Sequence, residues 1–194
     1  MLIKYSGHDI SSILFLGIFI GISVAIAAIT LDISFTVGEN VFASAPNMTA
    51  VDGIRCDTME FTMFHIHAHL DIFVNGKPFT IPSQIGIDPE GRCLYWVHTH
   101  DDSGIIHIES PVEREFTFGN FIDIWGQTFN NTRLFDNNLN ETNSTLSMYV
   151  NGVKVPTNTD FRNVNINAHD EIALIFGQIQ ADKIPSRYQF QQGL

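Results

Sequence analysis

The sequence predicts a mostly-β domain, a small sandwich or barrel built from hairpins, behind one N-terminal transmembrane helix. Three observations predict this class. Short segments of alternating apolar and polar residues are separated by turn signals, only one short helix is plausible among them, and a long uncharged segment precedes them all. The 194 residues suffice for one ordinary domain and one attached segment.

Residues 10–31 contain no charged residue and are rich in Ile, Leu, Phe, Ala and Gly. This stretch of 22 residues can cross a bilayer, which needs about 20, and it exceeds the apolar core of a typical secretory signal. Lys4 precedes the stretch and Asp32 follows it, so residues 1–9 are predicted to be cytoplasmic. We expect a single-pass anchor in the cell membrane, with a signal cleaved after the Ala-Ser-Ala run at 43–45 as the alternative. Both place the remainder on the extracytoplasmic side.

Residues 32–55 lack periodicity and contain Gly and Pro, which is typical of a linker. We expect one domain over 56–180 and a polar tail over 181–194. The first strand is predicted over 64–74, where apolar residues alternate with histidines, so that one face of the strand is buried. Asn75-Gly76 then predicts a tight hairpin turn into the next strand.

The later elements follow from the same signals. Residues 118–129 could form a short helix with an apolar face towards the core, although Gly119 and Gly126 weaken this prediction. The Asn- and Thr-rich residues 130–145 are predicted to be a surface loop. Further strands are predicted at 77–81, 94–99, 105–110, 146–150, 153–156 and 169–177.

The part of the chain after Pro46 holds 9 Lys and Arg and 18 Asp and Glu. Such an acidic domain is a poor partner for nucleic acid, and its charge is typical of a soluble surface. Cys56 and Cys93 form an even pair, which in an oxidising compartment predicts a disulfide between the two histidine-rich segments. Acceptor patterns compatible with extracellular glycosylation begin at Asn47, Asn130, Asn140 and Asn143.

Six of the eight histidines fall in two short clusters, which are His65, His67 and His69, then His98, His100 and His107. In the second cluster, a hairpin with a two- or four-residue loop places all three histidines and Glu109 on one face. With a loop of 101–104, His98 lies directly opposite His107; with a two-residue turn at 103–104, His100 does. A three-residue loop would turn His107 away.

Three neutral imidazole nitrogens that converge on one point are the ligand set of a catalytic zinc ion, and copper accepts the same donors. We therefore predict a copper or zinc ion at His98, His100 and His107. The competing interpretation is the wet face of an amphipathic hairpin. Glu109 is a candidate ligand, general base or orienting acceptor, and otherwise a solvated edge carboxylate. The acidic residues at 101–102 are expected to cap the turn.

The first cluster, His65, His67 and His69, occupies one strand without an evident partner across the sheet. We expect at least two of its members to bind metal as well. If this strand lies beside the hairpin, six histidines face one cavity, so either two ions bind or some histidines only support the ligands. Met63 shares this face and would suit a soft copper ion, although a methionine beside an apolar strand is more often core. His8 and His169 are not assigned to the site.

The run from Cys93 to Pro111, CLYWVHTHDDSGIIHIESP, together with the earlier HIHAHL and the later FIDIWG, resembles a family of uncharacterised exported archaeal and bacterial proteins. The resemblance covers residues 56–126 and implies no activity. The site is also loosely similar to those of α-type carbonic anhydrases and cupins. The spacing from His100 to His107 is shorter than in either family, and Glu109 follows the last histidine, so these are analogies of site.

These features predict a tethered extracytoplasmic metal-binding protein that captures or delivers copper or zinc. Two enzymatic alternatives remain open. One is a zinc-dependent lyase or hydrolase that activates water, as a carbonic anhydrase does, with Glu109 as its catalytic residue; the other is a copper oxidase or oxygenase that uses both clusters. The sequence contains no nucleophile elbow and no phosphate-binding loop, so serine-hydrolase and nucleotide chemistry are not supported. It indicates no particular protein partner.

Overall fold

The computed structural model describes residues 49–139 and 144–194. The predicted N-terminus, the membrane segment and most of the linker lie outside the described residues, as does part of the predicted loop over 130–145. Among the described residues, no helix is both long and apolar enough to span a membrane. This described part is mostly β, as predicted, with one short α-helix.

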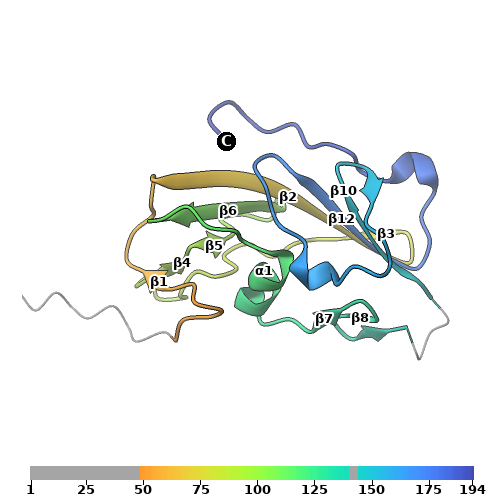
Figure 1. Ribbon diagram of the computed structural model, residues 1–194, viewed down its shortest axis with the longest axis horizontal. Helices are drawn as coiled ribbons and strands as arrows, with labels where there is room; N and C mark the ends of the chain where they lie inside the picture. The colour runs from red at the N-terminus through yellow and green to blue at the C-terminus, as the bar shows by residue number, and fades with distance from the viewer. Residues whose placement is uncertain (1–48, 140–143) are drawn as a thin grey trace, which may run out of the picture. The chain divides into compact units, whose positions relative to one another are not determined.

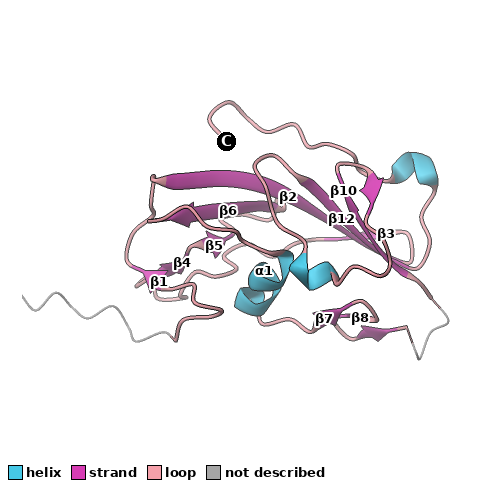
Figure 2. Cartoon of the chain, viewed as in Figure 1, coloured by secondary structure: helices cyan, strands magenta, loops and turns pink. Residues whose placement is uncertain are grey.

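A seven-stranded mixed sheet forms the centre of the described part (Figures 1 and 2). Its strands lie in the order β11-β10-β12-β2-β6-β5, and β3 pairs with β2 beyond the end of β6. Their bounds are β2 (Phe64–Val74), β3 (Lys77–Phe79), β5 (Val97–His98), β6 (Ile105–Ser110), β10 (Leu146–Val150), β11 (Val153–Lys154) and β12 (Glu171–Phe176). The strands predicted in these regions are confirmed, several of them shorter than predicted.

β2 is the central strand of this sheet. β6 pairs with its first half in antiparallel orientation, and β12 pairs with its second half in parallel orientation. On one face of β2, the side chains of Ala68, Leu70 and Ile72 are buried in the core. Figure 1 shows α1 (Phe118–Trp125) below the sheet and the C-terminal segment above it. The histidines of β2 project to the face opposite the apolar residues, because side chains alternate along a strand.

Local capping interactions set both ends of α1. Thr117 accepts a hydrogen bond from the Asn120 amide, and the Asn120 side chain accepts one from the Thr117 amide. Gly126 ends the helix in a left-handed conformation, with φ of 73°. The helix is therefore shorter than the predicted 118–129, because Gly126 is its C-cap. Single 3₁₀ turns, η1 (Phe161–Asn163) and η2 (Ala181–Lys183), follow later in the chain.

Two small sheets accompany the central sheet. β1 (Cys56–Asp57) pairs with β4 (Leu94–Tyr95), so the strand predicted over 94–99 is divided into β4 and β5. β7 (Phe129–Asn130), β8 (Arg133–Leu134) and β9 (Asn137–Asn138) form a three-stranded sheet. The prediction of a loop throughout 130–145 is therefore wrong in its first half, where burial of Leu134 outweighs the polar composition. The described strands form open sheets, so the closed barrel is excluded for this part of the chain.

Asn75-Gly76 forms the predicted hairpin turn, and Asn151-Gly152 forms a second turn of the same kind. Asn75 and Gly76 have φ of 52° and 77°, and Asn151 and Gly152 have φ of 53° and 76°. Left-handed conformations at both central residues are typical of the type I′ turn, whose twist matches that of the flanking strands. These turns connect β2 to β3 and β10 to β11.

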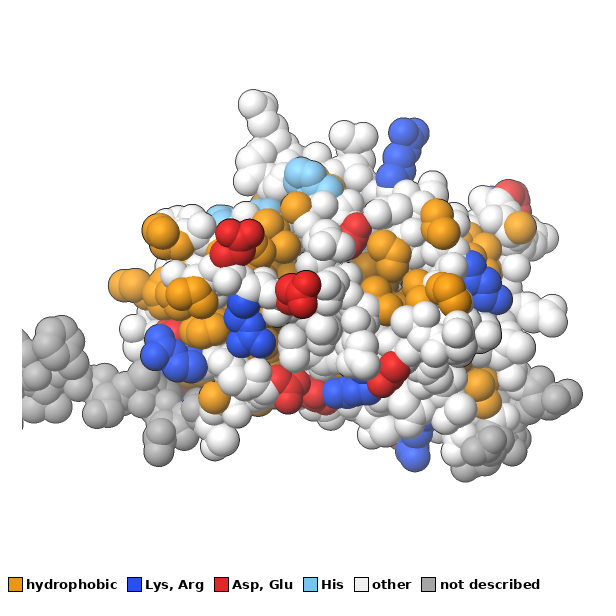
Figure 3. Space-filling model, in the orientation of Figure 1, with side chains coloured by type: hydrophobic (Ala, Val, Ile, Leu, Met, Phe, Trp, Pro, Cys, Tyr) orange, Lys and Arg blue, Asp and Glu red, His pale blue; other side chains and the backbone are white. Residues whose placement is uncertain are grey.

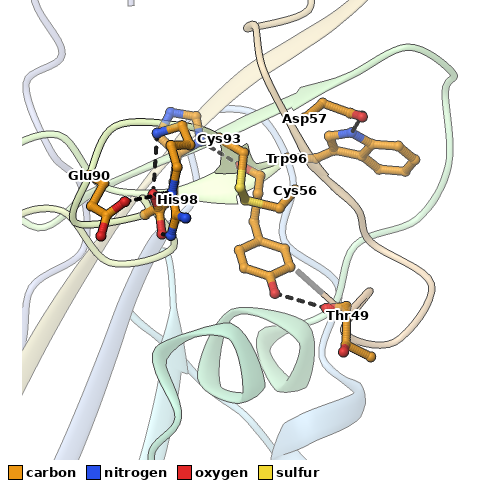
Figure 4. The surroundings of a disulfide bond; sticks show 10 residues. Thr49, Cys56, Asp57, Glu90, Cys93, Trp96 and His98 are labelled. Carbon is orange, nitrogen blue, oxygen red and sulfur yellow. Dashed lines mark hydrogen bonds and ion pairs between the residues drawn. A yellow bond between two sulfur atoms is a disulfide. The ribbon is translucent and has the colours of Figure 1, made fainter. Parts of the chain in front are cut away.

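Cys56 and Cys93 form the predicted disulfide, with Cα atoms 5.4 Å apart. The disulfide joins β1 to the residue that precedes β4, near the segment that carries His98 (Figure 4). Ile54, which precedes the predicted start of the domain, is fully buried, and Tyr95 donates a hydrogen bond to the Thr49 carbonyl oxygen. The last residues of the predicted linker therefore pack against the domain and belong to it.

The C-terminal segment runs from η2 across the sheet on the side opposite α1 (Figure 1). Tyr188 stacks on His69 with ring centroids 3.8 Å apart. Phe190 lies against His169, with ring centroids 4.9 Å apart. The segment predicted to be a polar tail over 181–194 therefore packs against the domain through these two aromatic residues.

Candidate metal centre

Three adjacent strands, β2, β6 and β5, bring histidines together on one face of the sheet. His67 and His98 both lie directly opposite His107, one on each side of β6. His65 lies directly opposite Glu109. We define the histidine cluster as His65, His67, His98, His100, His107 and Glu109. Histidine side chains reach the surface along the upper edge of the molecule in Figure 3.

The hairpin that carries His98 and His107 connects β5 to β6 through residues 99–104. His98 pairs with His107, which confirms the first of the two predicted registers. Asp101 caps the turn, because its carboxylate accepts a hydrogen bond of 2.9 Å from the Ser103 amide. Gly104 has φ of 89°, and a Cβ atom there would lie 2.6 Å from the Leu70 carbonyl oxygen. Glycine is therefore required where the hairpin meets β2.

Two pairs of nitrogen atoms lie at the distance expected between neighbouring ligands of one ion. The Nε2 atoms of His65 and His67 are 3.1 Å apart, and those of His98 and His100 are 3.2 Å apart. Two nitrogens bound to one ion at about 2.0–2.1 Å, with square or tetrahedral angles, lie about 2.9–3.4 Å from each other. The same separation fits an N–H···N hydrogen bond in the metal-free protein. Both pairs therefore need little movement to bind a metal ion.

The cluster contains two overlapping groups of possible ligands. His65 and His67 form one group with His107 and Glu109, and His98 and His100 form the other with the same two residues. Within each group, the four ligand atoms all lie within 4.8 Å of one another. The described residues therefore include a histidine and glutamate site that could hold a metal ion.

The protonation state of His98 is set by its neighbours. Its Nδ1 atom donates to the Tyr95 carbonyl oxygen at 2.9 Å, which leaves the lone pair on Nε2. Carbonyl oxygens commonly orient metal-binding histidines in this way. Burial lowers the pKa of His98 to about 4, although the backbone hydrogen bond opposes the shift. His98 is therefore neutral at pH 7, as a metal ligand must be.

His67 is also neutral at pH 7. Burial, followed by the charges of His107 and His65, lowers its pKa to about 4. Its Nε2 atom faces the Nε2 atom of His65. His67, on the strand next to β6, is thus in the protonation state that metal binding requires.

Glu109 is 3% exposed and is the acidic member of the cluster. Burial alone would raise the pKa of Glu109, but its hydrogen bond to His107 and the charges of His98 and His65 lower it overall. Its Oε1 atom lies 3.1 Å from His65 Nε2, whereas Oε2 is buried without a hydrogen-bond partner. A buried, ionised carboxylate with an unpaired oxygen favours a cation beside it.

His69 is not part of the histidine cluster. Its Nε2 atom lies 2.8 Å from the Ser103 carbonyl oxygen, and its Nδ1 atom lies 2.9 Å from Glu171 Oε2. Burial alone would lower the pKa of His69, but the hydrogen bond and the charge of Glu171 raise it. Together with Asp71, these two residues form a separate group of possible ligands. The structure therefore brings five of the six predicted histidines together and places the sixth elsewhere on the same face.

Two acidic residues near the histidines escaped sequence reasoning. Glu171 reaches His69 through the parallel pairing of β12 with β2, which no local pattern indicates. Glu60 Oε1 lies 3.4 Å from His100 Nε2 and belongs to a segment without strand periodicity. The expectation that Met63 is a core residue is wrong, because Met63 is 83% exposed. Met63 lies just before β2, beside the exposed Thr62, and is therefore outside the part of the strand that the core covers.

Cavities of about 420, 380 and 280 Å³ lie elsewhere in the described part. None of the three is lined by a residue of the histidine cluster. The first is lined by Phe64, Ile66 and Phe116, which include side chains from the opposite face of β2. The histidine cluster and these three cavities are therefore separate features of the described part.

Comparisons of the chain with protein-family models, curated proteins and solved structures gave no match. The geometry of the site is therefore the basis for inferring its function.

Proposed function

We propose that this protein is a membrane-anchored, extracytoplasmic metal-binding protein that holds copper or zinc in the histidine cluster. The observation that carries the proposal is the convergence of five histidines from neighbouring strands on one buried carboxylate, Glu109. If these side chains only formed the solvent-exposed face of an amphipathic sheet, they would be in contact with water. His67, His98 and Glu109 are instead buried, which costs free energy unless their polar atoms form hydrogen bonds or bind a metal ion.

The donor set favours copper or zinc over other common ions. Imidazole nitrogen suits both, whereas magnesium and calcium prefer sites built from oxygen. The cluster offers nitrogen and carboxylate oxygen but no sulfur, because Cys56 and Cys93 form the disulfide and Met63 is exposed. Without a soft sulfur ligand, Zn²⁺ or Cu²⁺ is better suited to the cluster than Cu⁺.

The location rests on the sequence and on the disulfide. Residues 10–31 are uncharged and long enough to anchor the chain in a membrane. The Cys56–Cys93 disulfide is compatible with an oxidising compartment outside the cytoplasm. A domain tethered there would capture or deliver metal ions at the outer side of the membrane.

A zinc enzyme that activates water, with Glu109 as its base, would use the same side chains. We place metal binding first because the three cavities described above, which could hold a substrate, are lined by other residues. Proton release during hydration of carbon dioxide by the zinc-loaded protein would reverse this order.

The test is the metal content of the full-length chain, purified in detergent without added metal and again after loading with copper or zinc and desalting. We expect at least one equivalent of transition metal in the unmodified chain. Replacing His98, His100 and His107 by Ala should remove most of it, because both groups of ligands lose members.

The matched control combines His8→Ala with His169→Asn, which removes histidines outside the cluster. This variant should keep the full metal content. The absence of metal from the unmodified chain after loading would refute the proposal, as would an equal loss of metal in the control.

A further inference from the structure

The histidine cluster offers more ligands than one ion uses. A zinc or copper ion in a protein is usually bound by about four ligands, whereas the cluster supplies five imidazoles and one carboxylate. The surplus is divided evenly, because each group adds its own pair of histidines to the shared His107 and Glu109.

The two histidine pairs belong to opposite sides of β6. His65 and His67 lie on β2, whereas His98 ends β5 and His100 lies two residues further along the chain. β6 separates these strands in the sheet, so their backbones lie about 10 Å apart at the usual strand spacing. Each group of ligand atoms that lie within 4.8 Å of one another contains one of these pairs together with His107 and Glu109, and neither group contains both pairs. The pairs therefore converge on two neighbouring points, one on each side of β6.

Glu109 lies on β6, between the two points, with its two oxygens in different surroundings. Oε1 lies 3.1 Å from His65 Nε2 and 3.6 Å from His107 Nδ1. Oε2 is buried and has no hydrogen-bond partner. A carboxylate can bind one ion through each oxygen, and the negative charge of Glu109 would reduce the repulsion between two cations. The unpaired oxygen is a second, independent observation beside the shared ligand groups.

We infer that the centre is dinuclear. One ion is bound by His65 and His67, the second by His98 and His100, and the Glu109 carboxylate bridges them, with His107 completing the coordination of one ion. Metal pairs of this kind are typically about 3.5–4 Å apart. This inference rests on the proposed function, because it requires that the histidine cluster binds metal.

The experiment is a titration of the full-length chain with Cu²⁺, followed by native mass spectrometry and electron paramagnetic resonance. We expect two ions per chain. Because a bridging carboxylate couples the two unpaired electrons, the integrated resonance signal should fall well below that of two isolated Cu²⁺ ions. Glu109→Gln removes the charge of the bridge, and we expect it to restore an uncoupled signal or to reduce the content to one ion.

Glu171→Gln is the matched control, because Glu171 is also a buried glutamate beside a histidine on the same face. It should leave both the ion count and the coupling unchanged. Replacing His65 and His67 by Ala should leave one ion with the full signal of an isolated Cu²⁺, and so should replacing His98 and His100. Formation of the Cys56–Cys93 disulfide and an unchanged circular dichroism spectrum check folding, and His65→Ala alone serves as the milder variant because its side chain is 38% exposed.

The outcomes separate the two proposals. No bound copper, together with no bound zinc after loading with zinc, refutes the metal centre as a whole. One ion in the unmodified chain refutes the dinuclear inference and leaves the proposed function standing. Two uncoupled ions, of which Glu171→Gln removes one, would place the second ion at the His69 group and overturn the bridge.

Discussion

His69 and Glu171 form a buried polar pair in which each side chain depends on the other. Both nitrogens of His69 face oxygen atoms, one from Glu171 at 2.9 Å and one from the Ser103 carbonyl at 2.8 Å. Glu171 is 1% exposed, and Tyr188 covers the His69 ring. Removing one partner leaves the other buried without its hydrogen bond, which costs far more than breaking an exposed pair.

We expect His69→Ala and Glu171→Ala each to lower the free energy of unfolding by about 3–5 kcal/mol. The double variant should lose little more than either single variant, because the second substitution removes the group that the first leaves unpaired. Urea unfolding of the metal-free protein at pH 7 measures all three. Asp71→Ala is the control, and we expect a loss below about 1 kcal/mol because Asp71 is partly exposed and 3.9 Å from His69. If the double variant lost as much stability as the sum of the two single variants, His69 and Glu171 would not depend on each other.

At the scale of single elements, the loop between β5 and β6, residues 99–104, positions the second histidine group. His98 before the loop pairs with His107 after it, and the last residue of the loop, Gly104, contacts β2. The Leu70 amide donates a hydrogen bond of 3.0 Å to the Gly104 carbonyl oxygen. The loop therefore couples the hairpin to the strand that carries His65 and His67.

We expect Gly104→Ala to destabilise the protein by about 1–3 kcal/mol more than Gly91→Ala, because the new methyl group overlaps β2. Gly91 is a matched control: it also has positive φ, 68°, but no atom lies within 4 Å of its added Cβ. The difference between the two variants therefore isolates the close contact from the cost of the left-handed backbone. Thermal or urea unfolding measures it, and equal losses would show that the contact with Leu70 is unimportant.

Elements with local signals were predictable from the sequence, and those without them were not. The Asn-Gly turns depend on residues that adopt left-handed conformations readily, so their chemistry is visible in the sequence. Gly126 only weakened the predicted helix over 118–129, and its role as the C-cap of α1 was seen in the structure. The small sheet of β7, β8 and β9 has no such signal. It forms because Phe129 and Leu134 are buried, which is a property of the surrounding fold.

At the scale of the whole molecule, the apolar segment and the disulfide lead to one prediction about location. We expect the full-length chain to remain with membranes after an alkaline carbonate wash, with Cys56 and Cys93 oxidised and the domain accessible to protease added outside the cell. The reason for this expectation is that residues 10–31 are uncharged and long enough to cross a bilayer, and that the disulfide is compatible with an oxidising compartment. Fractionation and thiol labelling measure both properties.

A full-length chain in the soluble fraction with two free thiols would contradict anchoring and export together. A shortened soluble chain that retains the disulfide would support the cleaved signal instead. The prediction thus separates the two interpretations of residues 10–31.

Two registers of the hairpin were compatible with the sequence, and the structure has the one that pairs His98 with His107. The sequence by itself determined most of the strands, their buried faces, the disulfide partners and the common face of His98, His100 and His107. All of these except the disulfide depend on residues close together in the chain, and the disulfide follows because only two cysteines exist. Only the tertiary structure decided that β2 lies beside β6 and that β12 joins β2 in parallel. These pairings bring His67 to His107, and His69 to Glu171, which is 102 residues away. The physical reason is that burial of the apolar faces of the sheet selects the strand pairing and its register. The same register then fixes which polar residues meet on the opposite face.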